Sequence, residues 1–169
     1  WIAQQFKVPE ADMETQAKKR IKLLPDVIDN QYHGMKIAKY AFWLILAATI
    51  VRSLIHIFAA DGGAQTIATI PLDSYPAEAA AAVILMFSYW GLSQLLMGFV
   101  YLGVSLKYQS LIPAMYVLLI FEYAMRFIIG QVKPIVTTGT APGSIGNWIM
   151  VPVCIVLLVL SLMKEENHK

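Results

Sequence analysis

Two pairs of ionisable side chains stand inside stretches of this sequence that are otherwise apolar. Arg52 and His56 are four residues apart in one stretch, and Glu122 and Arg126 are four residues apart in another. A charge in the interior of a bilayer costs about 2.5–3.5 kcal/mol on insertion scales and usually faces neighbouring helices. We therefore expect these side chains to point into the protein and to meet there.

The spacing of Glu122 and Arg126 predicts an ion pair on one helix face, because residues i and i+4 are neighbours and the acid comes first. Arg52, from another helix, is a second candidate partner for Glu122. With a rise of 1.5 Å per residue, Arg52 lies roughly 12 Å and Glu122 roughly 12–14 Å from the same end of the bundle. The most polar part of a third apolar stretch reaches a similar depth; it contains Ser88, Tyr89, Trp90, Ser93 and Gln94.

This cluster has three interpretations. One buried carboxylate shared by two arginines can hold two helices in register, which is a purely structural role. Alternatively, two arginines against one glutamate leave a positive pocket with aromatic walls, suited to an anionic or polar lipid headgroup, a quinone carbonyl or a small carboxylate. The third is a proton relay or a catalytic role. The residues of the candidate ligand site are Arg52, His56, Tyr89, Trp90, Gln94, Glu122, Tyr123 and Arg126.

The remaining reactive side chains exclude several kinds of site. Cys154 is the only cysteine, so a disulfide framework, a multi-cysteine zinc site and a quinone-coupled dithiol are excluded. His56 is the only histidine within an apolar stretch, which excludes a haem with two histidine ligands from one chain. A metal site would depend on His56 and Glu122 with little help, and no serine, histidine and acid arrangement stands out. We predict no metal and no cofactor, leave bound phospholipid open, and favour a role other than catalysis.

Composition and charge spacing predict the elements that position these residues. The chain has 169 residues, of which 58% are hydrophobic and 14% charged, with a mean hydropathy of +0.61; soluble domains are about 45–50% apolar and about 25% charged. The net charge of +2 gives no reason to expect nucleic acid as a partner. Because the long apolar runs lack the alternation of a β-barrel, they predict an all-α, integral membrane four-helix bundle. The spans are expected at 37–60, 81–105, 111–131 and 146–163.

Basic residues predict the orientation of this bundle. They cluster before the first span, and Lys107, Lys164 and Lys169 fall on the same side of the membrane. The two connections on the other side hold only Lys133. By the positive-inside rule both termini are cytoplasmic. We expect a multi-pass protein of the bacterial inner membrane.

The chain divides into an N-terminal arm at 1–36, the bundle at 37–163 and a short tail at 164–169. Within the arm, residues 9–24 are expected to form an amphipathic cytoplasmic helix, because acidic residues come early and basic residues late. This helix would lie on the membrane surface, in solvent or against a partner.

Small residues and prolines add detail to the spans. Ser88, Gly91 and Gly98 form a stripe of small residues on the second span, which predicts close packing against another helix. Pro113 falls in the first turn of the third span, where a missing N–H is tolerated. Pro152 falls inside the fourth span and is expected to kink it.

Three segments carry a resemblance to a known family. Residues 89–103 read YWGLSQLLMGFVYLG, residues 111–135 read LIPAMYVLLIFEYAMRFIIGQVKPI, and residues 139–147 read GTAPGSIGN. The chain resembles, over roughly residues 85–163, an uncharacterised bacterial family of small four-helix integral membrane proteins. The resemblance implies the fold and a place in a membrane. It implies no activity and no catalytic residue, because none is known for the family.

Three functional hypotheses follow. The first is a non-catalytic, structural or accessory subunit of a homo-oligomer or a larger membrane complex, with membrane lipids, itself or other membrane subunits as partners. The second is a binder or transporter of a small amphipathic or anionic ligand, such as a lipid headgroup or a quinone, through the Arg/Glu cluster. A membrane enzyme or an accessory subunit of an electron-transfer complex is the third and weakest alternative.

Overall fold

The computed structural model describes residues 23–164, and no β-strand forms within this range. Its long helices are α2 (Lys36–Phe58), α3 (Ala77–Lys107), α4 (Ile112–Val132) and α5 (Pro142–Leu162), joined partly by the short 3-10 helices η1 (Leu72–Ser74) and η2 (Gln109–Leu111). Each of the four long helices is apolar and long enough to cross a membrane, which confirms the predicted four-helix fold. The predicted helix at 9–24 lies outside the described residues except for Leu23 and Leu24, which are not helical.

Two helices begin about four residues earlier than the sequence predicted. α3 starts at Ala77, directly after Pro76, and its alanine-rich first turns are strong helix formers. α5 starts at Pro142 rather than near residue 146, because the fixed φ of proline suits the first turn of a helix. At 31 residues α3 is about 46 Å long, so it exceeds the ~30 Å hydrocarbon core of a bilayer.

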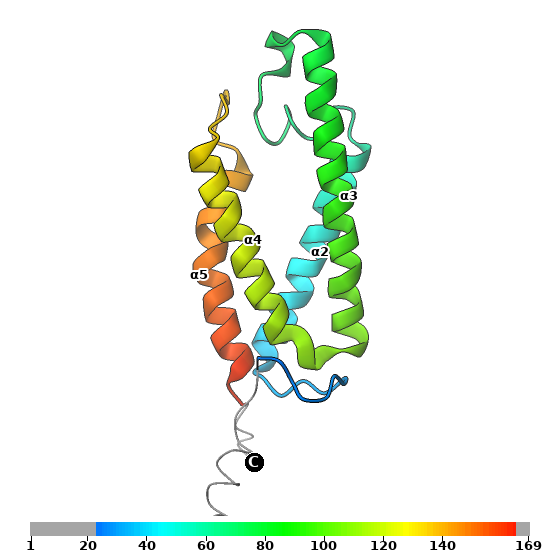
Figure 1. Ribbon diagram of the computed structural model, residues 1–169, viewed down its shortest axis with the longest axis vertical. Helices are drawn as coiled ribbons and strands as arrows, with labels where there is room; N and C mark the ends of the chain where they lie inside the picture. The colour runs from blue at the N-terminus through cyan, green and yellow to red at the C-terminus, as the bar shows by residue number, and fades with distance from the viewer. Residues whose placement is uncertain (1–22, 165–169) are drawn as a thin grey trace, which may run out of the picture.

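The four helices form two hairpins that diverge (Figure 1). α2 packs along α3 and α4 packs along α5, whereas α3 and α4 have few contacts with each other although they are consecutive. The hairpins meet at the end that holds the start of α2, the α3–α4 turn and the end of α5, which we call the terminal end. They move apart toward the loop end, which carries the α2–α3 and α4–α5 connections.

An aromatic core holds the hairpins together at the terminal end. The rings of Phe42, Tyr101 and Tyr116 are buried, and the Phe42 ring lies 5.4 Å from that of Tyr101 and 5.7 Å from that of Tyr116, both edge to face. The Tyr116 hydroxyl donates a 2.6 Å hydrogen bond to the Ala38 carbonyl. Buried aromatic pairs of this kind contribute about 0.5–1.5 kcal/mol beyond their area.

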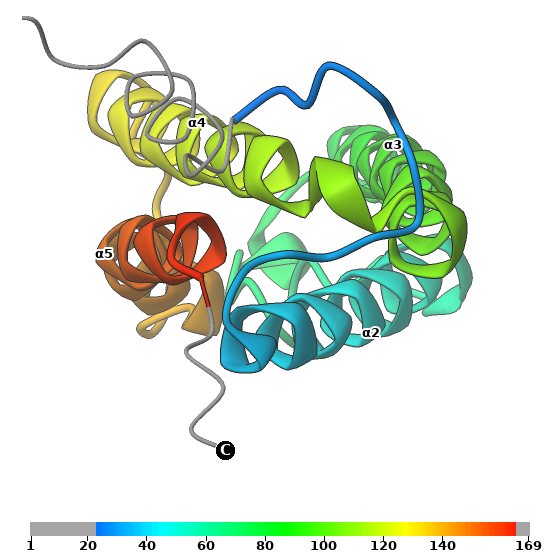
Figure 2. The same ribbon diagram turned by 90° about the horizontal axis from the view of Figure 1, so that it is seen from below.

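The segment 23–35 packs across the terminal end of the bundle. It runs past the α3–α4 turn to the start of α2 (Figure 2). Asp29 exchanges hydrogen bonds with Ser110, whose hydroxyl accepts from the Asp29 N–H at 3.0 Å and donates to its carbonyl at 2.9 Å. The Met35 N–H donates to the Leu160 carbonyl at 3.1 Å. Burial raises the pKa of Tyr32, whose hydroxyl donates to the Met35 carbonyl. This segment therefore links both hairpins.

Glycines set the close approach of α2 and α3. A Cβ at Gly91 would stand 2.7 Å from the His56 Cβ and 3.0 Å from the Ser53 carbonyl oxygen. A Cβ at Gly98 would stand 3.2 Å from Ile50. Ser88, the third residue of the predicted stripe, is half-buried and bonds to its own helix at the Ile84 carbonyl.

Replacing Gly91 with alanine is expected to push α3 away from α2 and to lower the free energy of unfolding. Overpacking of this kind costs about 1–3 kcal/mol. Gly103→Ala is the matched control, because nothing lies within 4 Å of a Cβ there and α3 is again the host helix. Thermal unfolding in detergent should show a lower Tm for Gly91→Ala than for Gly103→Ala. Equal values would contradict the glycine contact.

Candidate functional site

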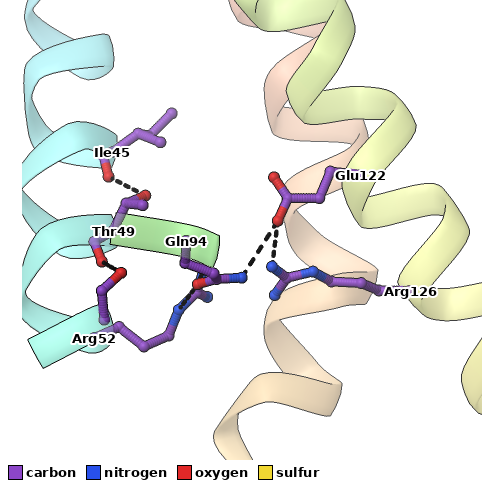
Figure 3. Close-up of polar contacts among 7 residues, drawn as sticks. Ile45, Thr49, Arg52, Gln94, Glu122 and Arg126 are labelled. Carbon is purple, nitrogen blue, oxygen red and sulfur yellow. Dashed lines mark hydrogen bonds and ion pairs between the residues drawn. The ribbon is translucent and has the colours of Figure 1, made fainter. Parts of the chain in front are cut away.

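A chain of polar side chains crosses from α2 through α3 to α4 (Figure 3). Arg52 donates from Nε and Nη2 to the Gln94 side-chain oxygen at 3.0 and 2.6 Å. The Gln94 amide nitrogen donates to Glu122 Oε1 at 3.4 Å. Arg126 forms an ion pair with the same carboxylate oxygen. Three helices therefore share one continuous network.

Gln94 lies where the sequence suggested a direct contact between Arg52 and Glu122. It is buried on α3 and occupies the space between the two charged groups. Arg52 forms no ion pair with any carboxylate in residues 23–164. The predicted pair of Glu122 with Arg126 is present, so one guanidinium has a counter-charge and the other has a neutral amide.

Trp90 is the aromatic centre of the cluster. The guanidinium carbon of Arg52 lies 5.9 Å from the Trp90 ring centroid, and that of Arg126 lies 5.0 Å from it. Arg126 also lies 5.6 Å from the Tyr123 ring. Cation–π contacts of this kind contribute about 0.5–2 kcal/mol, more where water is excluded. They hold both guanidinium groups beside the same indole ring.

His56 connects this cluster to the α2–α3 loop. Its ring lies 4.6 Å from the Trp90 ring, and Nδ1 lies 2.7 Å from the Gly62 carbonyl oxygen. Because a carbonyl oxygen only accepts, Nδ1 must carry the hydrogen. Gly62 and its neighbour Gly63 have φ values of +59° and +71°, which favour glycine.

Asp61 organises the rest of that turn. Its carboxylate accepts hydrogen bonds from the backbone N–H groups of Gly63, Gln65 and Thr66 at 2.9, 3.0 and 2.7 Å. Partial burial acts to raise the pKa of Asp61, but these hydrogen bonds outweigh it and hold the pKa below its usual value. The ionised form of Asp61 thus stabilises the loop that carries the His56 contact.

The cluster lines a cleft of about 830 Å³ between the two hairpins. Ligand pockets usually measure roughly 300–1,000 Å³. Five of the predicted site residues line the cleft; they are Arg52, His56, Trp90, Tyr123 and Arg126. The α4–α5 connection forms much of the remaining wall. Arg52 lies six residues before the end of α2 and Arg126 six before the end of α4, so both are about 9 Å inside the loop ends of their helices.

The two long connections meet at the loop end beside the cleft. The Thr138 N–H donates to the Thr69 carbonyl at 2.9 Å, and the Thr69 hydroxyl donates to the Gly139 carbonyl at 2.9 Å. The Thr138 hydroxyl also donates to the Thr69 carbonyl at 3.2 Å. These bonds join the diverging hairpins at a second place, far from the terminal end.

Three predicted residues do not line the cleft. Gln94 accepts hydrogen bonds from Arg52, and Glu122 pairs with Arg126, but neither residue lines the cleft itself. Tyr89 is 57% exposed and is not among the residues that line the cleft. Side chains of successive helical residues point about 100° apart, so Tyr89 points away from the cleft when Trp90 points into it.

Sequence reasoning missed part of the aromatic lining. Phe127 and Trp148 line the cleft with their rings 4.4 Å apart, and Phe87 lies edge-on to Trp90 at 5.7 Å. The spacing in the sequence could have identified two of them. Phe87 precedes Trp90 by three residues and Phe127 follows Tyr123 by four, so each shares a helix face with a predicted site residue. Trp148 lies on α5, and only the fold brings it to Phe127.

The chain matches no protein-family model, no curated protein and no solved structure. The resemblance seen in the sequence therefore transfers no fold or activity to it. Within residues 23–164, no group of three or more His, Cys, Asp or Glu side chains is placed to hold a metal ion.

The hydrogen bonds to Asp61 predict that the α2–α3 loop loses order in acid. Because the pKa of Asp61 is lowered by folding, its stabilising effect is present above the ordinary aspartate pKa and is lost as the pH falls through the lowered value. Hydrogen exchange should show protected Gly63 and Thr66 amides near neutral pH and reduced protection factors in acid. Asp61→Asn should remove this pH dependence; its persistence in that variant would contradict the assignment.

Proposed function

We propose that this protein binds an amphipathic ligand inside the membrane, with the polar headgroup at Arg52 and Arg126 and the apolar part in the cleft between the hairpins. The observation that carries the proposal is the position of two guanidinium groups and Trp90 on the wall of one cleft. The aromatic rings of Trp90, Phe127 and Trp148 offer an apolar surface beside them.

The exposure of the charged groups favours a ligand over a purely structural network. The Arg126 side chain, which lines the cleft, is 19% exposed despite its ion pair with Glu122. At this depth in a bilayer, an exposed charge lacks the water that would solvate it on a soluble protein. A ligand headgroup in the cleft would supply the missing polar partner.

The charge distribution supports one orientation of the site in the membrane. Lysines lie at the terminal end of the bundle, and Lys133 alone among lysines and arginines lies in a long connection of the described range. The positive-inside rule then favours cytoplasmic termini and a cleft in the outer half of a bacterial inner membrane. The role of an accessory subunit in an oligomer or a larger complex stays a prediction, because exposed apolar helix faces suit lipid and protein partners equally.

Tryptophan fluorescence tests the proposed site directly. The variant retains only Trp90, and its other tryptophans are replaced by phenylalanine. The probes are dibromostearic acid, dibromostearyl alcohol and decylubiquinone, each added to the protein in maltoside micelles. At least one probe should quench Trp90 saturably, because a discrete site fills, whereas partition into the micelle does not saturate. Arg52→Gln in this background should weaken the saturable phase at least tenfold, about 1.4 kcal/mol.

An exchange of neighbouring residues provides the matched control. Trp90→Tyr combined with Tyr89→Trp moves the indole out of the cleft without changing composition. This swapped protein should show only non-saturable quenching. If none of the three probes gives saturable quenching at Trp90, the proposed function is wrong.

A further inference from the structure

We infer that the ligand is an anion: a membrane amphiphile whose headgroup carries a carboxylate or a phosphate, bound beside Arg52 and Arg126. This inference rests on the proposed function and narrows its ligand class. It excludes a neutral quinone or an uncharged alcohol as the preferred occupant.

The charges around the cleft are unbalanced. Arg52, Arg126 and Lys133 line it, and no aspartate or glutamate is among its lining residues. Glu122 compensates Arg126 from behind the wall. The charges of Arg52 and Lys133 remain without a carboxylate on the cleft wall, and Arg52 lies deeper in the bundle than Lys133, which follows the end of α4. An anion is the ligand class that restores the balance.

The hydrogen bonding of Arg52 leaves donors for such an anion. A guanidinium carries five N–H groups, and the Gln94 oxygen accepts two of them, from Nε and Nη2. The Tyr123 side chain also forms a hydrogen bond with Arg52, so two of the five N–H groups remain. No carboxylate in the described chain takes the remaining N–H groups. The remaining N–H groups can donate to the oxygens of a carboxylate or phosphate.

A neutral ligand fits these groups less well. A quinone carbonyl or an alcohol can accept a hydrogen bond from Arg52, but it leaves the positive charge uncompensated in an apolar environment. An unpaired charge there is costly, whereas a charge-assisted hydrogen bond is roughly twice as strong as a neutral one. Gln94 also holds Arg52 in place before a ligand arrives, which reduces the ordering cost of binding.

Two matched pairs of probes test the charge preference. Dibromostearate is compared with dibromostearyl alcohol, and a brominated phosphatidic acid with the diacylglycerol that lacks its phosphate. In the Trp90-only protein at pH 8.5, the anion of at least one pair should bind at least fivefold more tightly than its neutral partner. The tighter of the two anions then distinguishes a free carboxylate from a lipid phosphate as the source.

Charge variants separate this inference from a general preference for amphiphiles. Arg52→Gln should abolish the anion preference of that pair, because it removes the uncompensated charge. Glu122→Gln should increase the affinity for the anion by a larger factor than the affinity for the alcohol, because it frees Arg126. The probe pairs on the protein without these substitutions remain informative if either variant fails to fold.

The outcomes distinguish the two claims. If the neutral partner of each pair saturates Trp90 quenching with an affinity within fivefold of its anion, the inference is wrong and the proposed function stands. If no probe saturates, the proposed function itself fails. An anion preference that survives in Arg52→Gln would overturn the assignment of the headgroup to Arg52.

Discussion

The constraint that governs this structure is the cost of a charge in hydrocarbon. Arg52 and Arg126 lie within helices that are apolar enough to cross a membrane, where an unpaired charge is costly. Glu122 compensates one of them through an ion pair, and Gln94 offers the other a single neutral oxygen. The location of the network between the helices follows from this constraint.

The architecture keeps the two arginines close without closing the space beside them. The aromatic core and the segment 23–35 join the hairpins at the terminal end, while the hairpins separate toward the loop end. Gly91 allows α2 and α3 to approach closely, so that Arg52 and Trp90 face the same cleft. A bundle packed evenly along its length would have buried the same residues and left no cleft.

The α2–α3 loop and the α4–α5 connection also help to position the residues of the cleft. Asp61 folds the α2–α3 turn through three backbone hydrogen bonds, and the Gly62 carbonyl of that turn orients His56 against Trp90. Thr69 then joins this loop to Thr138 and Gly139 of the α4–α5 connection. A substitution in either loop is therefore connected to the cleft residues His56 and Trp90 through a short series of contacts.

The sequence alone determined the fold class, the approximate spans and the charged cluster, because long apolar runs and buried charges are local signals with few structural solutions in a bilayer. The pair of Glu122 and Arg126 was predictable for the same reason, since both residues lie on one helix. Only the tertiary structure decided that Gln94 stands between Arg52 and Glu122, that Trp90 and not Tyr89 faces the cleft, and that Trp148 joins Phe127. These depend on the rotation of each helix and on the divergence of the hairpins, and both result from packing among residues far apart in the chain.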